Sequence, residues 1–246
     1  MTILSDTAMC LRCWDFSETS QTVSLLTREH GIIRGLAKGS RRDKGCFSGG
    51  FDPATRGNIV ARIKPNTELA TLTEWRLEQV WWEVRNDLLV NKAAIYAIDL
   101  VGRLITDHDP HPRVFDAMCM ALDRVDKGHS IGWPLLQFQW SLLVETGYKP
   151  TLVNDACDGD EILAFSCTAG GVVPDTGEVD RVRVRRETID LLQMLGNEQS
   201  LQPTEPDAIQ RANRLLAHYL RDLIGKETAA MRWMWNEDGI STQSPS

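Results

Sequence analysis

The spacing of apolar residues changes along the chain and predicts strands first and helices afterwards. Before residue 80, apolar positions come in short runs or alternate with polar ones, as in strands that bury one face. The predicted strands are Met9 to Trp14, which Arg12 interrupts, then Gln21 to Thr27, Ile32 to Ala37, Asn58 to Lys64 and Thr67 to Trp75. Short strands packed into so brief a segment predict a small barrel or sandwich.

From about residue 81 the apolar positions recur three or four residues apart, which is the period of a helix face. Ala94, Ile98, Val101 and Ile105 are one such series, and Pro112 suits the first turn of the next helix. Further helices are predicted over Trp133 to Thr146, Glu187 to Leu195 and Pro206 to Leu223. Residues 151–180 lack this period and contain four glycines, so they are predicted to form a loop-rich insertion.

These patterns predict an α+β protein with two parts. A β module covers residues 1–80, and a helical domain with the insertion at 151–180 covers residues 81–246. Because no Gly/Ser-rich linker lies between them, the two parts are expected to pack together.

Composition and charge refine this prediction. The 246 residues are 42% hydrophobic and 25% charged, which is an ordinary globular balance, and the formal net charge is -7. That charge alone argues against nucleic-acid binding, but a binding face needs only local positive potential. The segment 28–44 has six cations against Glu29 and Asp43, namely Arg28, Arg34, Lys38, Arg41, Arg42 and Lys44. One end of the chain is therefore expected to face DNA.

The densest part of this segment is the basic loop, residues 38–44, which follows a predicted strand and contains Lys38, Arg41, Arg42 and Lys44. Its cations can neutralise phosphates, and Arg28 and Arg34 are expected to support them. Single-strand binders also use aromatic side chains as stacking platforms. The candidates are Trp14, Phe16, Phe47 and Phe51, with Phe47 and Phe51 ranked first because they flank the loop. The alternatives are a merely solvated loop and aromatics that pack in the core.

Four segments, in the same order and at similar spacing, resemble the RecO family of recombination mediators. They are Trp14 to Ser20, Thr27 to Arg42 with its TREHG and GLAKGSRR sequences, Glu68 to Glu74, and Leu142 to Pro150. Ala164 to Ser166 and Ala169 to Val173 extend the resemblance. It covers residues 14 to 173, and the joint order of the segments is more specific than any one of them.

The resemblance implies an N-terminal OB-fold barrel, a helical C-terminal domain and a mediator that loads recombinase onto DNA coated with single-strand binding protein. It implies strand annealing, binding of single-stranded DNA, and partnership with RecR, with the acidic tail of single-strand binding protein and, indirectly, with RecA. The protein is expected to be non-enzymatic, without cofactor or membrane segment, and cytoplasmic at the nucleoid. The alternative is a generic OB-fold nucleic-acid-binding or scaffold protein; a small hydrolase or nuclease is disfavoured because no catalytic motif is found.

The last long predicted helix has a cationic stripe beside its apolar side. Arg211, Arg214, His218 and Arg221 follow one another at spacings of three, four and three residues, so they share one face. Such a stripe could receive an acidic peptide with an aromatic end. An ordinary amphipathic helix explains the same pattern.

The cysteines do not complete a metal site. Many RecO relatives have two C-x-x-C pairs after the Leu142 to Pro150 segment. The first pair falls at about Asn154 and Cys157 in this chain, and the second at Pro174 and Gly177; Cys167 precedes Gly170, at a position not expected to bind the metal. The carboxylates that could substitute are poor replacements in a thiolate site, namely Asp155, Asp158, Asp160 and Asp175. We therefore expect no zinc. Cys10-x-x-Cys13 is interpreted as ordinary strand residues, because side chains three apart in an extended strand point to opposite faces.

Overall fold

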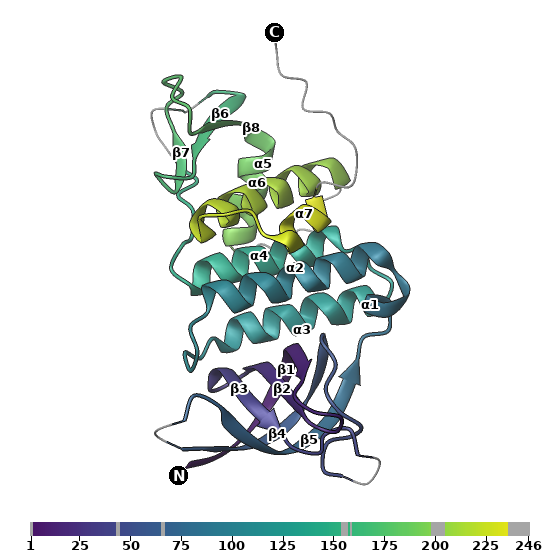
Figure 1. The fold of residues 1–246 in the computed structure, drawn as a ribbon. Coiled ribbons are helices and arrows are strands. Elements are labelled where there is room, and N and C mark those ends of the chain that lie inside the picture. Colours follow the sequence, from purple (N-terminus) through teal and green to yellow (C-terminus); the bar gives the residue numbers. More distant parts are fainter. Residues whose placement is uncertain are drawn as a thin grey trace.

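The described part of the chain forms three layers. The computed structural model describes residues 2–42, 45–64, 67–153, 157, 159–197 and 205–235. A β-barrel occupies one end, helices form the middle, and a small sheet lies at the other end (Figure 1). Barrel and helices in succession confirm the predicted α+β class.

Five antiparallel or parallel strand pairings close the barrel. The strands are β1 (Thr2–Asp15), β2 (Gln21–Thr27), β3 (Gly31–Ala37), β4 (Thr55–Ile63) and β5 (Ala70–Val80). Their order around the barrel is β1-β2-β3-β5-β4, with β1 also paired to β4 and with β3 parallel to β5. A closed five-stranded barrel of this order is the OB fold that the RecO resemblance implied.

The barrel interior contains the two aromatic rings that were ranked first for base stacking. Phe47 and Phe51 are only 6% and 5% exposed. The Phe51 ring lies 4.8 Å from that of Trp75, a fully buried residue of β5, and 6.0 Å from that of Phe47. The expectation that these two rings stack on bases is wrong, because barrel packing removes them from the surface.

A β-bulge changes the direction of side chains in β1. The register with β2 shifts between Cys10 and Arg12, so that Cys10 lies opposite Leu25 and Cys13 lies opposite Val23. Leu25 and Val23 both face the barrel interior. The argument that Cys10 and Cys13 point to opposite faces is therefore wrong. The bulge adds one residue to β1 between them, so the Cys13 side chain points to the same face as that of Cys10.

The helices form a bundle on the barrel. They are α1 (Glu83–Asn86), α2 (Leu88–Leu104), α3 (Pro112–Asp126), α4 (Gly132–Glu145), α5 (Arg186–Gly196), α6 (Pro206–Ile224) and α7 (Ala229–Trp235). The predicted long helices all form, and α1 and α7 are additional. Across the described residues, none of the helices combines the length and apolar character needed to cross a lipid bilayer.

Barrel and helices share one apolar contact. Met9, Leu26 and Ile32 point outward from the barrel and join the core of the helical part. Where the chain passes from β5 to α1, the Trp81 indole donates a hydrogen bond to Asp123 of α3 at 2.6 Å. The two parts therefore pack together, as the absence of a flexible linker suggested.

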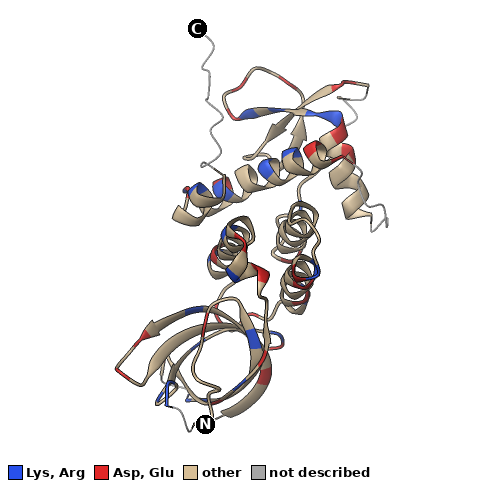
Figure 2. Ribbon diagram, turned by 90° about the vertical axis from the view of Figure 1, so that its right-hand side faces the viewer, with Lys and Arg blue, Asp and Glu red and all other residues tan. Residues whose placement is uncertain are grey.

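The predicted loop-rich insertion is more ordered than expected. Strands β6 (Ile162–Ser166), β7 (Gly171–Val173) and β8 (Arg181–Arg185) form a sheet of order β7-β6-β8. Leu163, Phe165 and Val172 are buried in the helical core, whereas Val153 and Ile162 are exposed. In Figure 2 this sheet lies above the long helix α6, at the far end from the barrel.

Candidate nucleic-acid interface

The basic loop is built against the hairpin that joins β1 and β2. The Arg41 amide donates to the Thr19 carbonyl at 3.1 Å, and the Gly39 amide donates to the Ser20 hydroxyl at 3.1 Å. Gly39 has a φ of 70°, which L side chains rarely adopt. Lys38, Arg41 and Arg42 are exposed on this frame, whereas Lys44 lies outside the described residues.

A buried amide fixes the loop to the barrel. The Gln21 side chain accepts from the Ser40 hydroxyl at 3.0 Å and from the Phe51 amide at 3.0 Å, and it donates to the Phe51 carbonyl at 3.2 Å. Gln21 and Ser40 are both buried. Because buried polar groups with satisfied hydrogen bonds hold a defined geometry, the cations are displayed on a preformed support.

The six cations of residues 28–44 do not form one patch. The β2–β3 ladder runs from Gln21 opposite Ala37, beside the basic loop, to Thr27 opposite Gly31, beside Arg28. These ends lie roughly 20 Å apart at about 3.3 Å per residue. Arg28 instead makes a bidentate pair with Asp116 of α3, at 2.9 and 2.8 Å, and this pairing raises its pKa. The structure therefore corrects the expectation that Arg28 supports the loop.

Arg34 lies between these ends, in a groove between the barrel and α2. Paired positions place Arg12, Ser24 and Arg34 in one row across β1, β2 and β3. Trp14 lies two residues after Arg12 in β1, and it is 53% exposed. The groove has a volume of about 560 Å³, and its lining residues are Leu11, Arg12, Trp14, Thr22, Val23, Ser24, Arg34, Leu69, Ile98 and Gly102.

Carboxylates of the helical part hold the two groove arginines in place. Arg12 pairs with Asp99 of α2 at 2.8 Å, and Arg34 pairs with Asp107 at 3.1 Å. Asp99 also forms an ion pair with Arg103 at 2.9 Å, so two guanidinium groups share this buried carboxylate. The shared carboxylate leaves an excess of positive charge beside Trp14, which suits a phosphate next to a stacked base.

Arg12 is a candidate that the sequence reasoning missed. Arg12 and Trp14 are two residues apart in a strand, so they share a face, and this signal was present in the sequence. Phe16, already a candidate, is also exposed, at the β1–β2 hairpin, and Arg41 pairs with Asp15 next to it at 2.6 Å. The exposed aromatics and the loop cations therefore meet at the hairpin.

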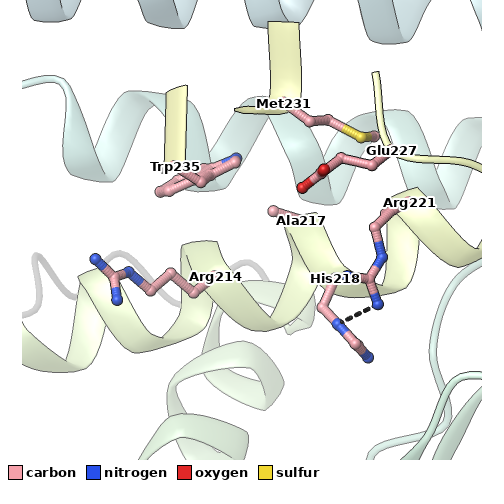
Figure 3. Close-up of a pocket in the computed structure, with 7 residues that line it drawn as sticks. All are labelled: Arg214, Ala217, His218, Arg221, Glu227, Met231 and Trp235. Carbon is pink, nitrogen blue, oxygen red and sulfur yellow. Dashed lines mark hydrogen bonds between the residues drawn. The ribbon is translucent and has the colours of Figure 1, made fainter. Parts of the chain in front are cut away.

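A second cationic site lies where α6 meets α7. Arg214, His218 and Arg221 line a pocket of about 230 Å³ together with Ala217, Glu227, Met231 and Trp235 (Figure 3). Arg221 donates to His218 Nδ1 at 2.9 Å. Burial, and next the charge of Arg221, lower the pKa of His218. Figure 2 marks in blue the Lys and Arg positions along α6.

Arg211 does not belong to this pocket. Its guanidinium turns toward α5, where it pairs with Glu187 at 3.2 Å. The predicted stripe of four therefore reduces to Arg214, His218 and Arg221. The Nε atom of Arg214 is buried without a hydrogen-bond partner among the described residues, as is the indole Nε1 of Trp235.

The described residues do not fit a structural zinc site. Cys157 and Cys167 are buried in the helical part, and burial raises the pKa of Cys167 to about 11, which disfavours the thiolate that zinc requires. Asp155 and Asp158 lie outside the described residues, and the described ones contain no cluster of three or more His, Cys, Asp or Glu placed to hold a metal.

The absence of zinc stays a prediction. Purified protein is expected to contain far less than one zinc per chain, and a chelator is expected to leave its melting temperature unchanged, since stability here comes from Leu163, Phe165 and Val172. Elemental analysis and melting with and without chelator measure both. Near-stoichiometric zinc, or a large loss of stability with chelator, would show that the ligands lie elsewhere.

Comparison with known proteins agrees with this architecture. Residues 1–81 match the family described as "Recombination protein O N terminal", and residues 85–232 match "Recombination protein O C terminal". A DNA repair protein RecO of Rhodopirellula baltica is 32% identical over 210 residues, covering 82% of this chain and 78% of the relative. That of Myxococcus xanthus is 29% identical over 238 residues, covering 93% and 96%. The chain belongs to the RecO family of DNA repair and recombination proteins.

Proposed function

We propose that this protein is a non-enzymatic recombination mediator that holds single-stranded DNA on the hairpin side of its barrel. The observation that carries the proposal is that exposed Trp14 lies on the same barrel face as Arg12 and Arg34, next to the basic loop. Cations beside a stacking platform are the combination by which OB folds bind single strands without reading their sequence.

The bound strand would contact both features. Bases stack on Trp14, and Phe16 offers a second ring at the hairpin. Phosphates contact Lys38, Arg41 and Arg42 of the loop, and Arg34 and Arg12 in the groove. Binding positions the strand for annealing and for transfer to recombinase, and no bond of the DNA is broken.

Replacing Trp14 with Ala tests this interface. Loss of a stacking platform is expected to weaken single-stranded DNA binding about 5- to 150-fold, corresponding to about 1–3 kcal/mol. Trp82→Ala is the matched control, because Trp82 is 62% exposed but lies before α1, away from the groove. Fluorescence anisotropy with a labelled oligonucleotide measures both. Equal affinities of the two variants would exclude Trp14 as a platform.

The pocket between α6 and α7 is proposed to receive the acidic tail of single-strand binding protein. Arg214 and Arg221 supply positive charge, and Met231 and Trp235 supply apolar surface for an aromatic end. Such contacts would bring the mediator to coated DNA, where RecR and RecA act next. A generic OB-fold binder without mediator partners would not bind this tail.

Reversing Arg214 and Arg221 to Glu is expected to weaken binding of the tail peptide by about 10- to 100-fold, since charge-assisted hydrogen bonds contribute about 1.5–3 kcal/mol. DNA binding by the barrel should change little. The matched control reverses Arg183 and Arg232, which are exposed outside the pocket. Titration calorimetry with the peptide and anisotropy with DNA separate the two activities. Equal loss of both, or loss of neither, would argue against a separate peptide site.

A further inference from the structure

Two cysteines of β1 face the barrel interior beside the hairpin. The bulge in β1 sets Cys10 and Cys13 opposite Leu25 and Val23, which are two residues apart on β2. Their Cα atoms are therefore expected about 6.6–6.8 Å apart, at the upper end of the separation that a disulfide spans. Without the bulge they would be about 10 Å apart on opposite faces.

The surroundings of the pair give the two thiols different properties. The Cys10 side chain is buried, and its Sγ donates to the Arg12 carbonyl at 3.8 Å. Interaction between the two thiols, together with burial, raises the pKa of Cys10, and the same interaction lowers the pKa of Cys13. The charge of Arg41 also lowers the pKa of Cys13, while burial and Asp52 oppose it. Cys13 is only half-buried, whereas Cys10 is buried, and the Cys13 sulfur is the more readily ionised of the two.

The other cysteines lack this combination. Burial raises the pKa of Cys119 and of Cys167 to about 11, and Cys157 is buried. Cys46 is exposed in the loop that follows the basic loop. Among the described cysteines, only Cys10 and Cys13 combine a half-buried thiol with a second thiol on the same face of one strand.

We propose that Cys10 and Cys13 form a peroxide-sensitive dithiol that closes reversibly to a disulfide. The Cys13 thiolate attacks a peroxide oxygen and breaks the O–O bond, which gives a sulfenic acid and, after protonation, one water or alcohol. The Cys10 sulfur then attacks the Cys13 sulfur, and the S–O bond breaks with release of water that takes the Cys10 proton. The peroxide is reduced by two electrons, and the two thiols are oxidised. A bond near its geometric limit is strained and readily reduced by thiols.

The test uses the full chain with Cys46→Ser, which removes the exposed competitor. Limiting hydrogen peroxide is expected to lower the intact mass by two hydrogen atoms, and peptide mapping should place the disulfide between Cys10 and Cys13. Dithiothreitol should restore the mass. This arm changes neither cysteine of the pair, so it does not depend on whether a variant at these buried positions folds.

Two further variants in the same background assign the roles. With Cys10→Ala, Cys13 should remain a sulfenic acid that dimedone captures; with Cys13→Ala, Cys10 should stay reduced. The proposal is overturned if peroxide converts Cys13 to higher oxides without a disulfide. It is overturned equally if the pair reacts no faster than Cys119 and Cys167. None of these measurements needs DNA, so they stand apart from the proposed function.

Discussion

Replacing Lys38, Arg41, Arg42 and Lys44 with Ala is expected to weaken single-stranded DNA binding roughly 100- to 1,000-fold at about 0.1 M salt. Each phosphate contact on a single strand releases about 0.7 counterion, so each lost contact costs about fivefold at that salt concentration. Arg41 already pairs with Asp15 at 2.6 Å, which favours the lower end of the range. The slope of log affinity against log salt should also fall, by about 0.7 per contact.

The control for this variant removes the same charge elsewhere. Arg183, Arg185, Lys226 and Arg232 are exposed in the C-terminal half, and replacing these four with Ala changes the net charge equally. A salt titration of DNA binding, followed by anisotropy, compares both variants with the unchanged protein. If the two variants have the same affinity and slope, the effect comes from overall charge and the basic loop is not the contact.

Local patterns predicted the elements whose pairing partners are close in sequence. β2 forms over the predicted residues Gln21–Thr27, because its neighbour β3 follows after one short turn. β1 begins seven residues earlier than predicted, at Thr2, because its first half pairs with β4, some fifty residues away. Ser5, Asp6 and Thr7 give no apolar signal for that pairing.

The site residues that were wrongly predicted to lie together on the DNA-binding surface fail for one physical reason. Phe47 and Phe51 are near the basic cations in sequence, but Trp75 of β5 packs against Phe51 at 4.8 Å and draws the loop into the barrel. Arg28 is near them in sequence and at the opposite end of the ladder in space. Distance along the chain is a poor guide to distance on a barrel. Each strand runs from one end of the barrel to the other, so residues at the two ends of one strand lie far apart.

Some signals were present and not used. Arg181 to Arg185 alternates arginine with valine, a period of two that predicts the edge strand β8. No element was predicted there, between the insertion at 151–180 and the helix that begins at Glu187. Arg12 was noted only as an interruption of an apolar run. The bulge next to it has no sequence signature of its own, so the meeting of Cys10 and Cys13 could not be predicted.

A buried chain of hydrogen bonds joins three helices of the helical part. The Tyr96 hydroxyl of α2 donates to the Gln139 carbonyl oxygen of α4 at 2.9 Å, and the Gln139 amide donates to Asn213 of α6 at 2.7 Å. Asn213 in turn donates to the carbonyls of Gly132 and Ile209. Burial raises the pKa of Tyr96 well above its usual range, so the hydroxyl stays a donor.

Gln139→Leu should therefore destabilise the protein by about 2–5 kcal/mol, because it leaves the Tyr96 hydroxyl and the Asn213 oxygen buried without partners. Gln210→Leu, the same change at an exposed position of α6, should cost less than about 0.5 kcal/mol. Adding Tyr96→Phe to Gln139→Leu should recover part of the loss, since it removes one of the two orphaned groups. Urea unfolding followed by circular dichroism measures all three. Equal stability of the Gln139 and Gln210 variants, or no recovery in the double variant, would show that the chain of bonds contributes nothing to holding α2, α4 and α6 together.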